Sequence, residues 1–353
     1  MKRNNATSRS RKRRGLKCLL ALLLACAACQ VHGQGGRRLR LVEYNVENLF
    51  DTLHAAGHED AEFTPRGERR WDSRRYWGKL GRLARVIAAA GDDVPAAAVA
   101  LCEVENDSVL SHLTRRTRLA RLGYGYIATR SADPRGVNVA LLYQPALFRP
   151  LGHSALRVPP PAGARQTRDV LHVAGLVQTG DTLDLMVCHF PSQRGGRRAE
   201  AYRRSVARAV RAAADSLARV RRNLYLVVAG DFNTGWPSAV FGAEGLCAAL
   251  PPGGGRDSLY LLSHALRGAG EVAGTYKYQG GWEQLDHFLV SGSLLAGGGG
   301  HPRTAAALCR IADFPFLLRR NRGGNLYPYR TYLGPYHQGG YSDHLPLVLD
   351  IFL

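Results

Sequence analysis

The sequence has few cysteines and no long apolar runs. Of its seven cysteines, only Cys102, Cys188, Cys247 and Cys309 follow residue 36, and they show no CxxC spacing, which argues against a zinc knuckle. No stretch after residue 36 is apolar for long enough to span a bilayer. Internal repeats and domain linkers are also lacking. We therefore expect one large domain over residues 37–353, monomeric and without a transmembrane segment.

Residues 1–36 have the layout of a secretory leader. A basic stretch precedes the apolar run from Cys18 to Cys29, and polar residues follow it. Two processing routes fit this segment. Leu23-Leu24-Ala25-Cys26 resembles a bacterial lipobox, which would make Cys26 a lipid anchor, whereas Gly33 would end an ordinary signal peptide. Either route predicts export, to the periplasm, to the outer membrane as a lipoprotein, or to the medium.

The four later cysteines leave two alternatives open. Cys102 and Cys188 lie inside apolar runs, where buried free thiols are common. Export permits disulfides, so a bond between Cys247 and Cys309 is the other alternative.

Acidic residues are outnumbered. The chain has 48 Lys and Arg against 28 Asp and Glu, a net charge of +20. Eight of the basic residues and none of the acidic ones lie in residues 1–36, so about +12 remains for the rest. A basic protein favours polyanions such as nucleic acid, phosphorylated metabolites or anionic lipid. Solvated arginines explain the same charge equally well.

Apolar runs of strand length alternate with amphipathic segments. Trp71–Ala90 and Arg198–Arg222 are predicted helices, because apolar side chains recur there at helical spacing. Several strand candidates are continuous apolar runs, as expected of strands buried on both faces. The candidates are Leu39–Asn45, Ala96–Glu103, Val137–Tyr143, Leu183–His189, Leu224–Asp231, Leu285–Val290 and Leu345–Ile351. This order predicts an α/β sandwich with loops gathered at one edge.

Six short polar motifs lie at or near the ends of apolar runs. They are Glu43–Asn48, Cys102–Asn106, His189–Ser192, Gly230–Asn233, Leu285–His287 and Ser342–His344. A charge at the end of a buried strand is costly unless it is solvated, paired or metal-bound. Each motif alone has a simpler interpretation, since strands often end in polar residues. Together they predict one metal-assisted hydrolytic site assembled from strand ends.

The carboxylates and amides of these motifs suit a metal and a phosphoryl group. Glu103 and Asp231 offer the hard oxygen ligands that Mg²⁺ prefers. Asp231 and Asn233 lie on one face of an extended segment, because side chains alternate. The Asp would orient water and the Asn would bind a phosphoryl oxygen, as would Asn45 at the end of the first strand.

The histidines of the motifs supply acid–base groups. His189 ends a strand candidate, and His344 precedes the last one. Asp286 is a candidate to orient His344 and stabilise its imidazolium. Asp343 adds a second carboxylate on the metal side.

This pattern resembles the endonuclease/exonuclease/phosphatase superfamily of DNase I-like proteins, in order and approximate spacing, over residues 38–353. The matching segments are Tyr44–Asp51, Glu103–Asn106, Arg135–Tyr143, His189–Ser192, Gly230–Asn233, Leu285–His287 and Ser342–Pro346. The resemblance implies a four-layered α/β sandwich, with two packed mixed β-sheets flanked by helices. It also implies phosphoester hydrolysis that depends on a divalent metal, Mg²⁺ or alternatively Mn²⁺ or Ca²⁺.

The resemblance also implies roles for single residues. Glu103 matches the metal-binding Glu, Asn45 the Asn near metal and phosphate, and Asp343 a metal-side Asp. Asp231 and Asn233 match the pair that handles water and phosphate. His189 matches a phosphate-contacting His that is sometimes assigned as the acid. Asp286 matches the partner of the general base, His344. Thr234 and Asn138 replace a frequent Asp, which bears on substrate choice or a second metal.

Three functions remain open. The first is an exported nuclease acting on DNA or RNA. Arg194, Arg197, Arg198, Arg203 and Arg204 follow the His189 motif, Arg319, Arg320, Arg322 and Arg330 are interleaved with Tyr327, Tyr329 and Tyr332, and Arg135 is expected to face a phosphate. The second is a phosphatase or phospholipase-like esterase for inositol phosphates or sphingolipid head groups, weakened by the lack of a long apolar hairpin. The third is a non-catalytic surface binding protein, disfavoured by the intact set of polar residues.

Overall fold

The protein is described from a computed structural model, which covers residues 37–252 and 254–353. Residues Arg38–Leu353 form one compact unit. The leader predicted for residues 1–36, with its two alternatives of a lipid anchor at Cys26 or a signal peptide that ends at Gly33, lies outside the described residues. In the part that is described, no helix is long and apolar enough to cross a membrane.

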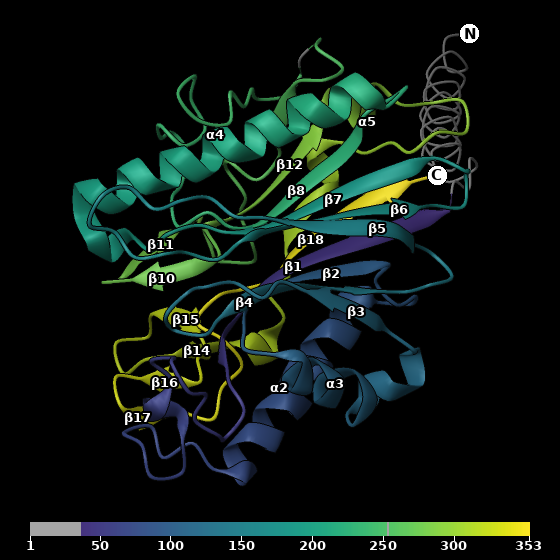
Figure 1. The fold of residues 1–353 in the computed structure, drawn as a ribbon. Helices are drawn as coiled ribbons and strands as arrows, with labels where there is room; N and C mark the ends of the chain where they lie inside the picture. Colours follow the sequence, from purple (N-terminus) through teal and green to yellow (C-terminus); the bar gives the residue numbers. More distant parts are fainter. Residues whose placement is uncertain (1–36, 253) are drawn as a thin grey trace, which may run out of the picture. The chain divides into compact units, whose positions relative to one another are not determined.

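Two six-stranded mixed sheets form the centre of this unit (Figure 1). The first sheet has the order β13-β18-β1-β2-β4-β3 and the second β5-β6-β7-β8-β12-β9. The first contains β13 (Cys309–Ile311), β18 (Leu347–Phe352), β1 (Arg38–Leu49), β2 (Ala98–Val104), β4 (Asn138–Tyr143) and β3 (Gly125–Ala128). The second contains β5 (Arg149–Leu156), β6 (Val170–Leu176), β7 (Thr182–His189), β8 (Tyr225–Asp231), β12 (Asp286–Ser291) and β9 (Leu259–Leu261).

Helices cover the outer faces of both sheets. Figure 1 shows α2 (Ser73–Gly91) and α3 (Asp107–Arg115) on the first sheet and α4 (Gly196–Val220) on the second. A short α5 (Gly292–Ala296) follows β12. The apolar stripe of α4 is buried against β7, β8 and β12, for example through Val206 and Val210. These layers confirm the predicted four-layered α/β sandwich, because each element buries its apolar face against a neighbour.

The remaining short elements lie around the sheets. Three two-stranded hairpins are formed by β10 (Tyr276–Tyr278) with β11 (Gly281–Glu283), β14 (Leu318–Arg320) with β15 (Leu326–Pro328), and β16 (Tyr332–Leu333) with β17 (Tyr336–His337). The short 3-10 helices are η1 (Ala61–Phe63), η2 (Arg118–Leu122), η3 (Gln193–Gly195), η4 (Ala306–Leu308) and η5 (Pro315–Leu317).

All seven predicted strands and both predicted helices are present, with small shifts at their ends. The sequence did not reveal β5, whose side chains are mostly exposed at the edge of the sheet and form no apolar run. It also missed α3, a helix of nine residues that begins after the N-cap Asn106. The alternative disulfide between Cys247 and Cys309 does not form: both thiols are free, Cys247 exposed and Cys309 buried in β13.

The register of β8 brings polar residues from three strands together. In the parallel pair with β7, Asp231 lies opposite His189, and in the antiparallel pair with β12 it lies opposite Asp286. Neighbouring strands are only about 4.8 Å apart, so these three side chains share one edge of the second sheet. In the first sheet, Asn45 of β1 pairs with Cys102 of β2, directly before Glu103.

Gly230 allows β8 to carry Asp231 into this position. Its φ is 146°, and a Cβ there would lie 1.8 Å from the carbonyl oxygen of Cys188. We expect Gly230→Ala to lower the free energy of unfolding by about 3 kcal/mol or more, because backbone strain and overlap add. Urea denaturation measures this loss. Gly152→Ala in β5 is the control, because nothing lies within 4 Å of a Cβ there. Equal midpoints for the two variants would contradict the prediction.

Candidate active site

The structure brings most of the predicted site residues together where the two sheets meet. They come from the ends of β1, β2, β7 and β8, the first residue of β12 and the loop before β18. Asn45, His189, Asp231, Asp286 and His344 are buried, and Glu103 is nearly so. Buried polar groups in this number need partners, so their contacts define the chemistry of the site.

His344 and Asp286 form a close pair. Nδ1 of His344 lies 2.7 Å from Oδ2 of Asp286, and the hydroxyl of Thr275 donates to the same oxygen. Burial alone would lower the pKa of His344, but Asp286, together with Asp231 and Asp343, raises it to about 10. His344 is therefore an imidazolium at neutral pH, and its Nδ1–H donates a hydrogen bond to Asp286.

Asp231 lies between this pair and the first sheet. Its Oδ2 accepts a hydrogen bond from Nδ2 of Asn45 at 3.1 Å, and its Oδ1 accepts one from the backbone N–H of Asn233 at 2.8 Å. Burial and the charge of Asp286 raise the pKa of Asp231 to about 7. Single ligand atoms of Asp231, Asp286 and His344 all lie within 4.8 Å of one another.

Glu103 occupies the opposite side of the site. Its Oε2 accepts a hydrogen bond from the backbone N–H of Asn48 at 2.8 Å, and its Oε1 lies 3.4 Å from Nη2 of Arg135. Burial would raise the pKa of Glu103, but Arg135 and the Asn48 N–H bring it below its usual value. Glu103 is therefore an anion in the site, and Arg135 binds that anion and the Asn48 side chain.

His189 connects Glu103 with Asp231. Its Nε2 lies 3.8 Å from Oε1 of Glu103 and 3.6 Å from Oδ2 of Asp231. Burial lowers the pKa of His189 well below its usual value, and Arg168 and Arg135 lower it further. The imidazole is therefore neutral, and these two contacts are not ion pairs.

Asn233 and Asp343 are placed less centrally. Nδ2 of Asn233 donates to the carbonyl oxygen of Phe190 at 3.0 Å, which fixes the side chain against the loop after β7. Asp343 is half-buried beside His344, and its charge raises the pKa of that imidazole.

Strained backbone is concentrated at this edge of the sheets. Glu47, Asn48, Glu103 and Asn233 all have left-handed φ values between 50° and 65°. Non-glycine residues adopt this conformation rarely, and such positions cluster at functional sites. The strain at Glu103 and Asn233 directs the strand ends toward the site.

Glu43, which lies beneath the site, was not predicted from the sequence. Its side chain is completely buried, and within the described residues neither carboxylate oxygen has a hydrogen-bond partner. Burial raises the pKa of Glu43 well above its usual value, and the charges of Asp286 and Asp231 raise it further. Burial and these charges therefore favour the neutral acid form of Glu43. Its position in the first motif was the only signal, since Glu is unexpected inside an apolar strand.

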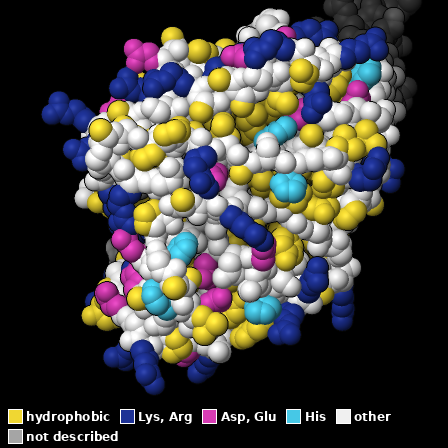
Figure 2. Space-filling view, in the orientation of Figure 1, with side chains coloured by type: hydrophobic (Ala, Val, Ile, Leu, Met, Phe, Trp, Pro, Cys, Tyr) yellow, Lys and Arg dark blue, Asp and Glu magenta, His cyan; other side chains and the backbone are white. Residues whose placement is uncertain are grey.

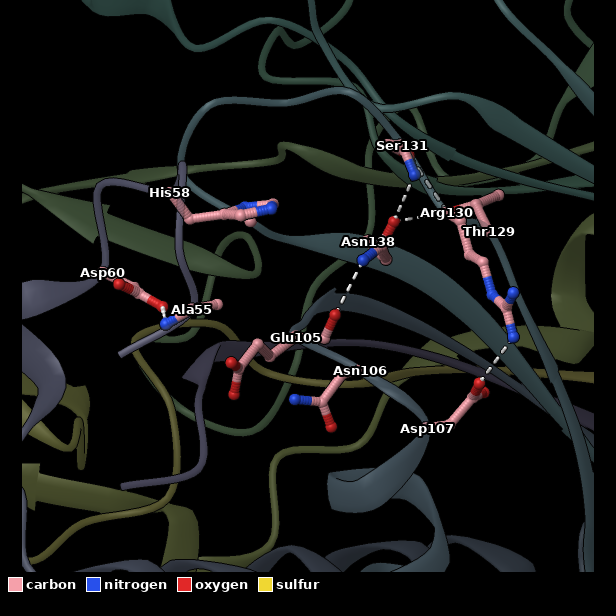
Figure 3. A pocket seen from close by; sticks show the side chains of 11 residues that line it. Ala55, His58, Asp60, Glu105, Asn106, Asp107, Thr129, Arg130, Ser131 and Asn138 are labelled. Carbon is pink, nitrogen blue, oxygen red and sulfur yellow. Dashed lines mark hydrogen bonds and ion pairs between the residues drawn. The ribbon is translucent and has the colours of Figure 1, made fainter. Parts of the chain in front are cut away.

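A cavity of about 290 Å³ lies beside Glu105 and was also not predicted (Figure 3). Figure 3 shows Glu105, Asn138, Thr129 and Ser131 around it, with His58 on the other side. Asn138 donates to the carbonyl oxygen of Glu105 at 2.7 Å and accepts from the N–H of Ser131 at 2.7 Å. Asn138, which replaces an Asp that is frequent in the family, thus lines this cavity.

The donor groups of the site fit a divalent cation. Magnesium prefers carboxylate and other oxygen ligands with retained water. Burial and the charge of Asp286 raise the pKa of Asp231, and a bound cation would stabilise its ionised form. The sequence predicts Glu103, Asn45 and Asp343 as ligands, and the compact group of Asp231, Asp286 and His344 is a second set that can bind a metal.

Comparison with known proteins places the chain in a family. The sequence profile of the Endonuclease/Exonuclease/phosphatase family matches residues 40–352. The chain belongs to this family. The family membership predicted from the sequence motifs is therefore confirmed, and the protein is a phosphoester hydrolase of the endonuclease/exonuclease/phosphatase type. A comparison with curated proteins finds no match.

Solved structures share the fold of this endonuclease/exonuclease/phosphatase protein. Humanized D. rerio TDP2 is 15% identical with a TM-score of 0.55, over 90% of this chain and 99% of that chain. A family protein from Bacteroides thetaiotaomicron is 16% identical with a TM-score of 0.55, over 90% and 98%. The human Nocturnin catalytic domain with bound sulfate is 15% identical with a TM-score of 0.53, over 90% and 95%. At these identities, the likeness concerns the fold alone.

The basic charge of this family member is not gathered in one place on the face shown in Figure 2. Lys and Arg side chains are spread over that face, with fewer Asp and Glu between them. Net charge alone therefore does not mark a binding surface there, and the substrate has to be argued from particular residues.

Proposed function

We propose that this protein is an exported, divalent-metal-dependent nuclease that cleaves phosphodiester bonds by in-line attack of water. The observation that supports it is the position of Asp231, which contacts Asn45 and His189 and lies close to the His344–Asp286 pair. Water activation and phosphate binding would thus take place around one carboxylate. Export rests on the sequence of residues 1–36.

Each side chain has a task in this proposal. Glu103, Asn45 and Asp343 would hold Mg²⁺ (or Mn²⁺ or Ca²⁺), which supplies positive charge against the developing charge of the phosphoryl group. Asp231 orients the attacking water. His344 accepts its proton at Nε2 while Asp286 holds Nδ1. Asn45, Asn233, His189 and Arg135 bind the non-bridging oxygens, provided that Arg135 exchanges its contact with Glu103 for a phosphate.

The substrate class is tested with purified protein and Mg²⁺ or Mn²⁺. Plasmid DNA, RNA, inositol phosphates and sphingomyelin are offered in parallel, with and without a chelator. Chelator-sensitive cleavage of DNA or RNA is expected. Turnover confined to inositol phosphates or sphingomyelin would replace the nuclease by the phosphatase or phospholipase-like alternative. No turnover on any of them would favour the non-catalytic binding protein.

Glu103→Gln tests the predicted metal ligand. Loss of its negative charge is expected to weaken metal binding on the order of 10- to 100-fold, the loss typical even of groups that only support a ligand. Isothermal titration with Mn²⁺ measures the affinity directly. Glu68→Gln is the control, because Glu68 is exposed. Unchanged Mn²⁺ affinity in Glu103→Gln would remove Glu103 from the proposed metal site.

A further inference from the structure

A second cavity, of about 340 Å³, lies among the three hairpins. We call it the hairpin pocket. Its lining includes Lys277 and Tyr278 of β10, Asn325 and Tyr327 next to and within β15, and Arg330 and Gln338 on either side of the β16–β17 hairpin. The proposed reaction does not use this pocket, although it adjoins the active site through β10.

An aromatic path connects the hairpin pocket with His344. The ring of Tyr276 packs on the imidazole of His344, with centroids 4.8 Å apart, and the backbones of these residues form a bridge. Tyr278 follows on the same face of β10, its ring 6.5 Å from that of Tyr276 and nearly parallel to it, at 15°. A group bound at Tyr278 is therefore only two residues along β10 from Tyr276, which contacts His344.

The lining of the hairpin pocket is aromatic, amide-rich and weakly cationic. Among the described residues, no Asp or Glu lines it. Lys277 already donates to the carbonyl oxygen of Leu326 at 2.6 Å and lies 5.0 Å from the Trp282 ring centroid. Arg330 lies 5.9 Å from the Tyr276 ring centroid and so adjoins the path. A polyphosphorylated head group would need several cations, whereas amides and an exposed aromatic face suit a nucleobase.

We propose that the hairpin pocket binds an unpaired nucleobase of the substrate strand, with Tyr278 as the stacking surface and Arg330 at the adjoining phosphate. The proposal rests on the proposed nuclease function, whose substrate it narrows to single-stranded nucleic acid. The Tyr278 side chain is 55% exposed, so its face is accessible to a base. Paired bases in a duplex are stacked on each other and do not offer a free face.

Tyr278→Ala is tested on two substrates that differ only in their bases. One is a fluorescent single-stranded DNA oligonucleotide, and the other is the same backbone with abasic sites throughout. Loss of one stacking contact is expected to raise KM for the oligonucleotide about 5- to 150-fold. KM for the abasic strand and kcat for both substrates stay unchanged. Tyr278→Trp restores the wild-type KM, and Tyr336→Ala, at a 73% exposed tyrosine outside the pocket lining, has no effect.

Binding of both strands is also measured by fluorescence anisotropy in the presence of a chelator, which does not depend on turnover. Weaker binding of the oligonucleotide alone by Tyr278→Ala supports the pocket even if neither strand is cleaved, in which case only the nuclease function fails. Cleavage of both strands with the same KM by wild type and Tyr278→Ala overturns the pocket and leaves the nuclease function standing. Equal affinity of the wild type for both strands also overturns it.

Discussion

Replacing His344 by alanine is expected to lower kcat by roughly 10²- to 10⁴-fold, the usual contribution of a general base. The fold should survive, because the Thr275 hydroxyl still donates to Asp286 after the imidazole is removed. Single-turnover rates at saturating Mg²⁺ measure the chemical step, and circular dichroism checks the fold. Asp231→Ala should have a comparable effect, since it removes the group that orients water. Near-normal hydrolysis by both variants would exclude this assignment.

The pair itself is tested by Asp286→Asn. Without the charge of Asp286, the pKa of His344 is expected to fall from about 10 toward its usual value near 6.5. An NMR titration of the chelator-treated protein follows the imidazole directly and needs no turnover. Asp181→Asn, next to the exposed His301, is the control and should leave His344 unchanged. If the pKa of His344 in Asp286→Asn equalled that in the wild type, the Asp286 carboxylate would not be the cause of the raised pKa.

The raised pKa of His344 also fixes the direction of the pH dependence. Protonated imidazole cannot accept a proton from water, so the rate should increase with pH until His344 is deprotonated. The same shift stabilises the folded chain most fully below pH 6.5, and this contribution is lost as the pH rises through about 10.

The sequence predicted which polar residues lie at the strand ends, but it did not predict which side chains contact one another. Apolar runs located β7, β8 and β12, and polar residues at their ends marked His189, Asp231 and Asp286. Whether Arg135 faces a phosphate or Glu103 depends on the loop before β4, whose path no periodicity specifies. In the structure, Arg135 binds Glu103 and Asn48. Such contacts link residues far apart in the chain, and only tertiary structure determines them.

The arginine-rich segments show the same limit. Their composition predicted phosphate binding, with a solvated loop as the alternative. In the structure, Arg319 stacks 3.5 Å from the Tyr329 ring centroid, and Arg320 pairs with Glu271 at 2.8 Å. Arg330 instead lies near Tyr276 and the hairpin pocket. Composition does not separate these cases, because they depend on which hairpins meet in space.

Glu43→Gln is expected to make the protein more stable than wild type at alkaline pH. In the folded state burial, with Asp286 and Asp231, raises the pKa of the Glu43 carboxyl well above its usual value, whereas in the unfolded chain it ionises near pH 4.3. The unfolded state therefore binds fewer protons above that pH. Wild-type stability then declines by up to about 1.4 kcal/mol per pH unit on this account. Glutamine cannot ionise, so the variant lacks this part of the decline.

Urea denaturation between pH 5 and pH 9, with a chelator present, measures the difference between the two proteins. Asp231 and Glu47, whose pKa values burial raises to about 7, also weaken the wild type as pH rises, but they remain in the variant and largely cancel in the comparison. Glu68→Gln, at an exposed carboxylate, should follow the wild-type curve. Parallel curves for wild type and Glu43→Gln would mean that Glu43 is ionised beneath the site. The negative charge around Asp286 would then be larger than the raised pKa of Glu43 implies.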